Sequence, residues 1–238
     1  MKKQPELSVV IPCYNEAKSL PELLQKCAAF MQNANMELVI VDNGSSDDTP
    51  RIIKEAKKKY PFLNPCRVDV NQGYGFGILS GLRHATGEYL CWTHADLQTD
   101  PADVQKGLEL IGALPPEEQK SVFVKGSRYG RPITDVLFTV GMSFFEILLL
   151  RKTLWDINAQ PTMFHSAFLE RWENPPHDFS LDLYAFYLAR KFKLKTLRFP
   201  VRFGERVHGV SHWNVDWKSK VKFIKRTLDF SFKLRKTL

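Results

Sequence analysis

The chain has 238 residues, of which 44% are apolar, 12% aromatic and 25% charged, a composition that excludes intrinsic disorder. Its 13 glycines and 4 cysteines exclude a collagen-like protein and a disulfide-rich scaffold. The net charge of +8 is uneven: residues 186–238 hold 15 basic against 3 acidic residues, and residues 1–185 hold 19 against 23. A basic end of +12 on a body of −4 predicts an anionic partner, such as phosphates, acidic lipid or nucleic acid. The alternative is a solvated basic helix.

The N-terminal residues, the apolar runs and the cysteines predict a cytoplasmic protein. The N-terminal apolar run is short and broken by Pro12, so we expect no signal peptide. The longest apolar run, Val136–Leu150, is interrupted by Glu146, so we expect no membrane-spanning helix. No CxxC pair is present, and we expect reduced thiols in the core at Cys13, Cys27, Cys66 and Cys91.

The first 130 residues alternate apolar strands with amphipathic helices. The pattern predicts strands over 7–11, 37–41, 66–70 and 88–93, and helices over about 17–32, 49–60 and 77–85. Continuous apolar strands that alternate with helices are typical of an α/β fold. We therefore expect a Rossmann-like, mostly parallel central sheet with helices on both faces.

The pattern changes after residue 96. Helices are predicted over 100–114, 134–154 and 179–191, and strands over 121–124 and 194–201. The helix over 134–154 is apolar nearly all round, which predicts that it is buried or dips into a membrane surface.

A basic amphipathic helix is predicted at the C-terminal end. Apolar residues recur at 213, 217, 221, 224 and 228, with basic side chains off that stripe. The pattern fits docking on an anionic membrane leaflet, and the alternative is that this helix covers the sheet or forms an oligomer interface. We therefore divide the chain into one domain over 1–212 and a helical tail over 213–238.

Polar and acidic residues follow the ends of four predicted strands, at 12–16, 42–47, 71–77 and 94–98. In a parallel α/β sheet, ligands bind at the carboxyl ends of strands, near the point where the strand order reverses. The Gly73-Tyr74-Gly75-Phe76-Gly77 string follows the third strand, whereas the dinucleotide fingerprint follows the first. We therefore expect no nicotinamide cofactor, and we expect these glycines to form a loop with positive φ.

His94, Asp96 and Gln98 lie in the string whose residue types are best suited to bind a ligand or a metal ion. In an extended segment, alternate residues point the same way, so these three side chains are expected to converge on one point. A hard divalent cation held by one carboxylate, substrate phosphates and waters fits such a sparse set of ligands. The alternative is a helix cap at Asp100 with an incidental histidine.

Taken together, LSVVIPCYNEAKSL, ELVIVDNGSSDDT, NQGYGFG and HADLQTDP resemble, in order and spacing, the family 2 glycosyltransferases, which have the GT-A fold. Gly126-Ser127-Arg128-Tyr129 and Arg206-x-x-Gly209-x-Ser211 extend the resemblance over residues 7–212. The nearest group is similar to the polyprenyl-phosphate sugar transferases, such as dolichol-phosphate mannose synthase. This implies an inverting enzyme that moves a sugar from UDP or GDP to a polyprenyl or dolichyl phosphate, peripheral at the cytoplasmic face of the membrane. The alternative is a saccharide hydroxyl acceptor in cell-surface polysaccharide synthesis.

The resemblance also implies the residues that bind the donor. Pro12, Tyr14 and Glu16 would line the nucleoside pocket, and Asp42 would hydrogen-bond the base or the ribose. Phosphate oxygens would be bound by Arg128, Arg206 and Ser211, because a guanidinium fork matches their geometry.

Asp96 and Gln98 would hold Mg²⁺ or Mn²⁺ on the donor diphosphate, and His94 stands where the family has an aspartate. The imidazole would then assist Asp96 at the metal or contact the diphosphate as a cation. Asp96 and Arg128 would stabilise the departing diphosphate. Asp182 would act as a base for a hydroxyl acceptor, whereas a lipid phosphate needs none. The alternative role of Asp182 is a favourable charge at a helix N-terminus.

Two other classes of protein fit less well. Sugar-nucleotide synthesising nucleotidyltransferases resemble this pattern but have a Gly-rich basic loop after the first strand, where this chain has residues 12–16. A nucleic-acid- or lipid-binding module would explain the basic tail and leave the acidic strand ends without a purpose. We therefore expect an enzyme that binds no nucleic acid.

Overall fold

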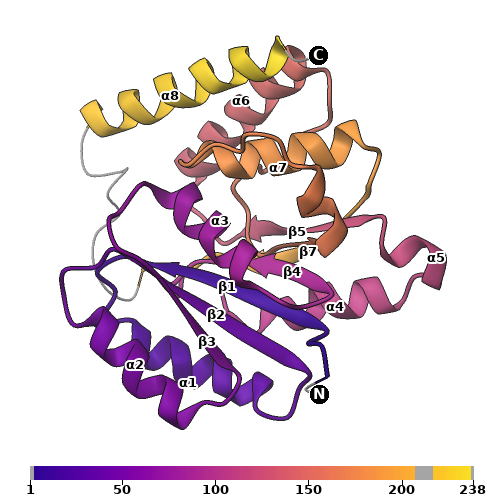
Figure 1. Ribbon diagram of the computed structural model, residues 1–238. Coiled ribbons are helices and arrows are strands. Elements are labelled where there is room, and N and C mark those ends of the chain that lie inside the picture. The colour runs from indigo at the N-terminus through magenta and orange to yellow at the C-terminus, as the bar shows by residue number, and fades with distance from the viewer. Residues whose placement is uncertain (1–2, 207–216, 237–238) are drawn as a thin grey trace.

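The computed structural model describes residues 3–206 and 217–236. These residues form a seven-stranded sheet. Helices lie on both faces of the sheet (Figure 1). The strands are β1 Leu7–Cys13, β2 Met36–Asn43, β3 Leu63–Val68, β4 Tyr89–Trp92, β5 Val122–Tyr129, β6 Thr162–His165 and β7 Lys195–Arg202. The helices are α1 Leu20–Met31, α2 Thr49–Lys59, α3 Tyr74–His84, α4 Asp103–Gly112, α5 Pro116–Gln119, α6 Ile133–Leu150, α7 Ser180–Lys191 and α8 Trp217–Arg235, with a 3₁₀ turn over Ser166–Arg171.

The sheet is mostly parallel, in the order β3-β2-β1-β4-β6-β5-β7. The α/β class and the first four strands are confirmed, with boundaries that differ by a few residues. Strand β6 was not predicted, and it runs antiparallel to both β4 and β5. The chain leaves the end of β5 through α6 and returns to the sheet near that same end, where Arg128 N donates a hydrogen bond to Asp156 Oδ2. Strand β6 therefore runs antiparallel to β5.

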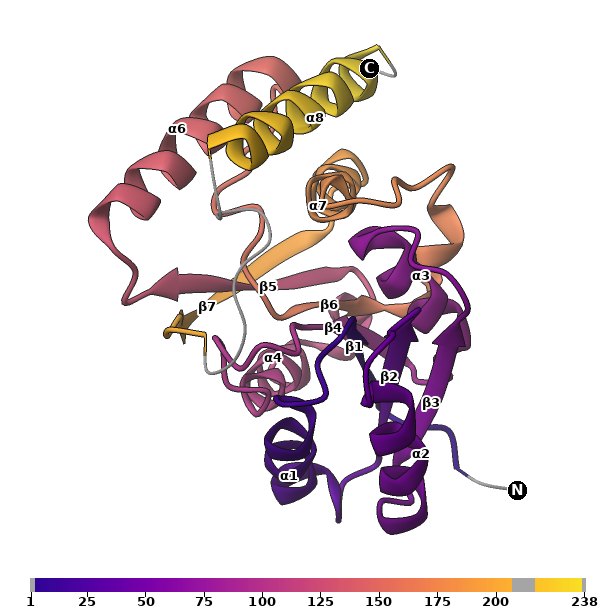
Figure 2. The same ribbon diagram turned by 90° about the vertical axis from the view of Figure 1, so that its left-hand side faces the viewer.

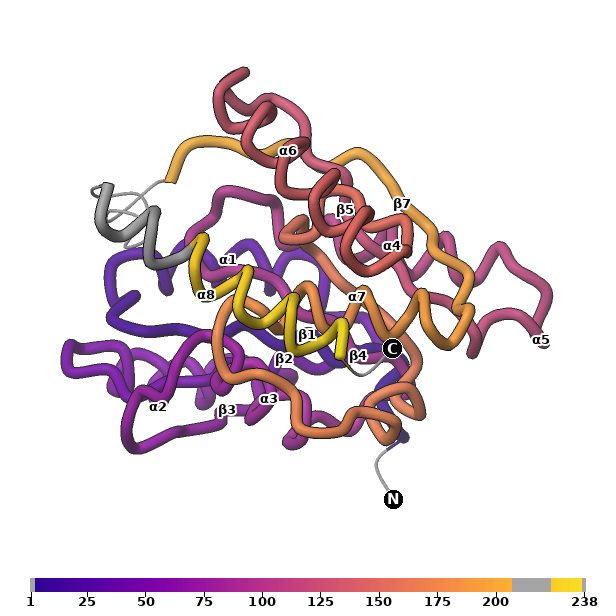
Figure 3. Tube along the Cα trace, turned by 90° about the horizontal axis from the view of Figure 1, so that it is seen from above, coloured from indigo at the N-terminus to yellow at the C-terminus, as the bar shows by residue number. Residues whose placement is uncertain are grey.

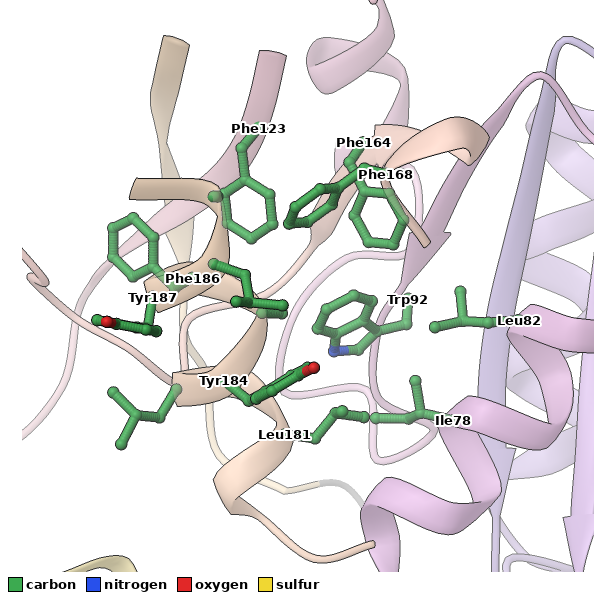
Figure 4. Close-up of a cluster of buried hydrophobic side chains, with 14 of the residues drawn as sticks. Ile78, Leu82, Trp92, Phe123, Phe164, Phe168, Leu181, Tyr184, Phe186 and Tyr187 are labelled. Atoms are coloured by element: carbon green, nitrogen blue, oxygen red, sulfur yellow. The ribbon is translucent and has the colours of Figure 1, made fainter. Parts of the chain in front are cut away.

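Two hydrophobic cores fill the two faces of the sheet, and Figure 2 shows the helices that cover each face. Helices α1, α2 and α4 cover one face, and α3 and α7 cover the other. The second core is rich in aromatic side chains, which Figure 4 shows packed between α7 and the sheet. Trp92, Phe123 and Phe164 are completely buried there, and pairs of their rings lie 5.9 and 6.2 Å apart. The four cysteines are free; Cys13, Cys27 and Cys91 are buried as expected, whereas Cys66 is only half-buried.

The Gly-rich string is mostly helical, so the expected loop with positive φ is confirmed only in part. Helix α3 begins at Tyr74, and of the three glycines only Gly73, the residue before the helix, has a positive φ, of 112°. Gly75 is required for another reason: a Cβ there would lie 2.6 Å from the Asp178 carbonyl oxygen. These glycines let the chain before α7 pack directly on the start of α3.

Two further boundaries differ from the prediction. Strand β5 continues to Tyr129 instead of ending at residue 124, so Arg128 lies within the strand and not after it. Helix α6 ends at Leu150 instead of residue 154, because Arg151 adopts the left-handed conformation, with φ of 53°. The chain that follows α6 is therefore free to return to the sheet.

Helix α8 lies along α6 and across α7, as Figure 3 shows from above. Its buried side chains in the described part are Ser231 and Leu234. By length and composition, α6 could cross a membrane. Only 22% of it is buried, whereas the core helix of a soluble protein is mostly buried. Its large exposed apolar residues are Ile133, Leu137, Phe138, Val140, Phe144 and Leu148. The predicted helix start at residues 213–216 lies outside the described residues, and the division into a domain and a tail stays a prediction.

Candidate active site

The strand order reverses between β1 and β4, so the loops after these strands meet at one edge of the sheet. The loop after β1 is held by the loop after β2. The contacts join Asn15 N to Ser45 Oγ at 3.0 Å, Glu16 N to Thr49 Oγ1 at 3.0 Å and Ala17 N to Asp47 Oδ2 at 3.1 Å. These bonds fix the loop between Pro12 and Glu16, and they leave the Tyr14 ring 42% exposed at the edge of the site.

Asp42 is buried at the carboxyl end of β2. It accepts a hydrogen bond from Ser45 N at 2.9 Å, and its Oδ2 pairs with Arg67 NH1 at 2.7 Å. The Arg67 side chain is 53% exposed. A base or ribose bound by Asp42 would therefore also lie beside this guanidinium, which the sequence analysis did not identify.

Arg206 brings together two carboxylates from different loops. Its NH2 lies 3.1 Å from Asp96 Oδ2 and 4.0 Å from Glu16 Oε1. Burial is the main reason why the pKa of Glu16 is raised, and the Asp96 charge raises it further, against the opposing effects of Ser19 and Arg206. Asp96 and Glu16 together form an acidic pair that a cation stabilises.

The segment over 94–98 is not extended, so the expected convergence of three side chains is wrong. Leu97 has a φ of 58°, and Asp96 Oδ1 accepts a hydrogen bond from Gln98 N at 3.2 Å. Gln98 Nε2 donates to the Gly204 carbonyl at 3.2 Å, and the His94 ring stacks on Tyr74 with centroids 5.7 Å apart. This bend turns the three side chains toward three different partners.

The residues at this bend can supply only a minor part of the ligands of a divalent cation. Among residues 3–206 and 217–236, no group of three His, Cys, Asp or Glu side chains is placed to hold a metal ion. Asp96 offers one carboxylate and His94 one imidazole, so a cation would need further ligands from a diphosphate and water. The carboxylate suits Mg²⁺ and Mn²⁺, and the imidazole favours Mn²⁺. The metal-binding roles of His94, Asp96 and Gln98 stay predictions.

Arg128 belongs to a cluster of three arginines around Asp156. Its Nε donates to Asp156 Oδ1 at 2.8 Å, and its backbone N donates to Oδ2 at 2.9 Å. Arg131 and Arg198 lie 3.7 and 3.9 Å from the same carboxylate. Burial would raise the pKa of Asp156, but its bonds to Arg128 and the neighbouring charges hold that pKa below its usual range. Three cations around one anion leave an excess of two positive charges.

The arginine cluster opens into a narrow pocket between α6, α7 and α8. The space inside is about 50 Å³, which suits a few waters or one phosphate-sized group. The Arg128 side chain lines it on one side, and apolar side chains line much of the rest: Phe138, Met142, Ile157, Phe179 and Leu183. This pocket combines a cationic wall with apolar surfaces.

We call the edge where the loops after β1 and β4 meet the donor edge, after the donor binding that the sequence resemblance implies. The segment after β7 joins this edge to the arginine pocket. The Arg128 guanidinium lies 5.4 Å from the centre of the Phe203 ring, and Gly204 N donates to the Gln98 carbonyl at 2.7 Å. Asp96 itself pairs with Arg206 and not with Arg128. Arg128 and Asp96 thus contact the same short segment from two sides. Ser211 lies outside the described residues.

Asp182 is buried in a polar network between α7 and the sheet. Its Oδ1 accepts a hydrogen bond from Gln160 Nε2 at 2.6 Å and lies 4.0 Å from Lys125 Nζ. Burial raises the pKa of Asp182 despite the opposing charges of Lys125 and His94. Burial also lowers the pKa of Lys125 to about 7. The side chain of Asp182 is 2% exposed, and its assignment as a base stays a prediction.

Glu146 is a second buried carboxyl group, on the wall of the pocket. It lies on α6, is completely buried, and accepts a hydrogen bond from Ser231 Oγ of α8 at 2.6 Å. Burial raises the pKa of Glu146 to about 7, and the Ser231 bond opposes this only in part. The carboxyl group is therefore largely protonated below neutral pH.

This shifted pKa predicts a pH-dependent stability that Glu146→Gln removes. Between pH 4.5 and about 7, Glu146 ionises in the unfolded chain but stays protonated in the folded one, so the folded state loses relative stability as the pH rises. Relative to the variant, the wild-type free energy of unfolding should fall by about 3 kcal/mol across this window and then level off. Urea unfolding of both proteins at pH 4.5–8 measures this. A difference that stays constant with pH contradicts the prediction.

The fold defines the class of protein. Over 97% of this chain, it matches a mannosyltransferase from Pyrobaculum calidifontis solved with GDP-Man and Mn²⁺, with a TM-score of 0.69, 20% identity and 65% of that chain covered. Over 98% of this chain and 80% of the other, it matches glucosyl-3-phosphoglycerate synthase from Mycobacterium tuberculosis solved with Mn²⁺ and UDP, with a TM-score of 0.67 and 15% identity. The chain has the GT-A fold.

The sequence comparison matches the first half of the chain to a family profile. Residues 8–118 match the profile of Glycosyl transferase family 2. An undecaprenyl-phosphate 4-deoxy-4-formamido-L-arabinose transferase of Edwardsiella ictaluri is 29% identical over 221 residues, 88% of this chain. The corresponding protein of Pseudomonas fluorescens is 30% identical over 227 residues, 87% of this chain. The chain spans 63% and 60% of the lengths of these relatives.

Proposed function

We propose that this chain is an inverting glycosyltransferase that moves a sugar from UDP or GDP to a polyprenyl phosphate. The observation that carries the proposal is the arginine cluster around Asp156, which opens into the narrow pocket with apolar walls. A phosphate group fits the pocket and its excess positive charge, and the isoprene chain outside the pocket fits the exposed apolar side of α6, which includes Phe138 of the pocket wall. The undecaprenyl-phosphate transferase activity named for the relatives supports this choice of acceptor.

The donor would lie at the edge between β1 and β4. Tyr14 and Pro12 would line the nucleoside pocket, where the exposed Tyr14 ring is free to stack on a base. Asp42, with Arg67 beside it, would contact the base or the ribose. The diphosphate would lie against Arg206 and His94, and the two solved relatives that hold Mn²⁺ support a divalent cation there, either Mg²⁺ or Mn²⁺.

The proposed reaction follows from where charge develops. Cleavage of the sugar–phosphate bond leaves a nucleoside diphosphate, and Arg206, which lies beside Asp96, would neutralise its oxygens. A bound divalent cation supplies further charge neutralisation at that diphosphate. Arg128, which the resemblance assigned to the departing diphosphate, would instead hold the acceptor phosphate, because it lines the pocket between α6, α7 and α8. The acceptor would then lie on the opposite side of the sugar, so that attack inverts the anomeric centre. The acceptor phosphate is already anionic, so Asp182 can remain buried, and no general base is needed.

Transfer from a panel of donors tests the function. Purified protein is incubated with UDP- and GDP-sugars, with and without Mn²⁺, and with either a short polyprenyl phosphate or an oligosaccharide as acceptor. Sugar transferred to the polyprenyl phosphate in the presence of the cation is the expected result. Transfer to the oligosaccharide alone would favour the saccharide acceptor, and release of no nucleotide from any donor contradicts both.

We also propose that the protein is peripheral at the cytoplasmic face of the membrane. The exposed apolar side of α6 lies beside basic α8, and Arg151, Lys152 and Arg235 line a shallow pocket where the two helices end. An apolar stripe flanked by cations fits an anionic lipid surface, which is where a polyprenyl phosphate is found.

Exchanging Leu137 and Leu148 together for serine is expected to weaken binding to anionic vesicles about 30-fold. The two side chains are 65% and 64% exposed, so the change removes apolar area from the proposed membrane contact and little from the core. Sedimentation with phosphatidylglycerol–phosphatidylcholine vesicles measures the affinity. Val70→Ser, an equally exposed apolar residue after β3, is the control. Equal binding of the control and the double variant contradicts this docking surface.

A further inference from the structure

The start of α7 is held by one side chain of α8. Arg226 Nε lies 3.1 Å from Asp178 Oδ2, and the Arg226 guanidinium lies 5.8 Å from the centre of the Phe179 ring. Asp178 and Phe179 are the two residues that precede Ser180, the first residue of α7. A single guanidinium therefore contacts both an anion and an aromatic face at this helix end.

Phe179 continues this contact toward the donor edge. Its ring stacks on Tyr74, with centroids 4.5 Å apart and planes 13° apart. Tyr74 stacks in turn on His94, with centroids 5.7 Å apart and planes 29° apart. Arg226, Phe179, Tyr74 and His94 form a continuous row that starts on α8 and ends in the loop after β4.

The backbone around this row of side chains is closely packed, so the starts of α3 and α7 have little freedom to move relative to each other. Phe76 N of α3 donates to the His177 carbonyl at 3.0 Å, so the chain before α7 is bonded to the first turn of α3. A Cβ at Gly75 would lie within 2.9 Å of three atoms of residues 176–178, so this contact is backbone against backbone. The starts of α3 and α7 therefore form one unit, and the ring stack lies against it.

We propose that Arg226 is a positioning residue for His94, and that it acts through Phe179 and Tyr74. The seating of α8 on α7 thereby sets where the imidazole lies at the donor edge. The contact of His94 with the donor diphosphate rests on the proposed function, whereas the position of the ring does not. The competing explanation is that Arg226 anchors α8 and has no effect on His94.

The His94 ring protons report the stack directly, because an imidazole against a tyrosine face experiences its ring current. We would record their NMR signals in the wild type and assign them with His94→Gln among the six histidines. Arg226→Gln is expected to move the His94 signals toward the positions of an unstacked histidine, and Arg226→Lys, which keeps the charge, should restore most of the shift. Lys225→Gln removes the same charge from an exposed neighbour and should leave the His94 signals in place.

A second variant separates positioning from the anchoring of α8. Phe179→Leu leaves the partners of the Arg226–Asp178 ion pair in place and removes the ring between them and Tyr74. It should move the His94 signals as Arg226→Gln does, without a loss of α8 protection in hydrogen exchange. His94 signals that stay in place in either Arg226→Gln or Phe179→Leu overturn the proposal.

The transfer assay gives an independent readout. With a nucleotide-sugar donor, Arg226→Gln should raise the donor KM about fivefold and leave the acceptor KM unchanged. A rise in the acceptor KM alone contradicts positioning at the donor edge. A wild-type protein that transfers no sugar contradicts the proposed function, and in that case the NMR comparison still decides whether Arg226 positions His94.

Discussion

Exchanging Asp96 for asparagine is expected to lower kcat/KM for the nucleotide-sugar about a hundredfold to a thousandfold, with the chain still folded. The asparagine keeps the shape of the side chain and its bond from Gln98 N, and it removes the negative charge that faces Arg206. A charge that acts on the departing diphosphate, directly or through a cation, contributes about this much to a rate. The loss should not be recovered by raising the Mn²⁺ concentration to saturation.

Initial rates of nucleoside diphosphate release, measured across a Mn²⁺ series, test this expectation. Glu109→Gln is the matched control, because it makes the same change from carboxylate to amide on the exposed side of α4. Wild-type rates in Asp96→Asn would mean that this carboxylate has no part in transfer.

Exchanging Arg128 for glutamine is expected to lower kcat/KM for the polyprenyl phosphate about a hundredfold. Arg128 makes the closest contacts in the arginine cluster, and it is the arginine of that cluster that lines the pocket. Loss of a charge-assisted bidentate contact to a phosphate, together with the weakened pairing of half-buried Asp156, has an effect of this size. Arg128→Lys keeps the charge without the planar fork, so its kcat/KM for the polyprenyl phosphate should lie between those of the wild type and Arg128→Gln.

The acceptor and donor constants must be measured separately for this variant. The proposal assigns Arg128 to the acceptor, so the acceptor KM should rise while the donor KM stays near the wild-type value. Arg51→Gln, an arginine 58% exposed on α2, controls for the loss of one positive charge. A rise confined to the donor KM would assign Arg128 to the nucleotide diphosphate instead.

The elements predictable from the sequence are those that repeat a local pattern. Strands β1, β2 and β4 are apolar on both faces and are followed by polar loops, so each is recognisable without its neighbours. Strand β6 is as short as β4, but no polar loop marks its end, because it runs directly into the 3₁₀ turn over Ser166–Arg171. The end of α6 was also missed, because the left-handed turn at Arg151 depends on where the following chain packs rather than on a glycine.

The site follows the same rule. Arg206, Asp96 and Glu16 were identified because each lies in a motif, and the structure brings these three together. Asp156 and Arg198 were missed because they come from a loop and a strand far apart in sequence. Arg198 reaches the cluster only because β7 pairs in parallel with β5, where it lies opposite Lys125. The spacing of residues along the sequence does not predict a contact that is set by sheet register.

The seating of α3 on the chain before α7 has one more consequence. In dinucleotide-binding proteins, free peptide N–H groups at a helix start hold the phosphates, and no side-chain substitution can remove them. Here the Phe76 amide is already bonded to the His177 carbonyl. The diphosphate would then be bound by individual side chains. A single amino-acid substitution could therefore abolish diphosphate binding while the fold stays intact.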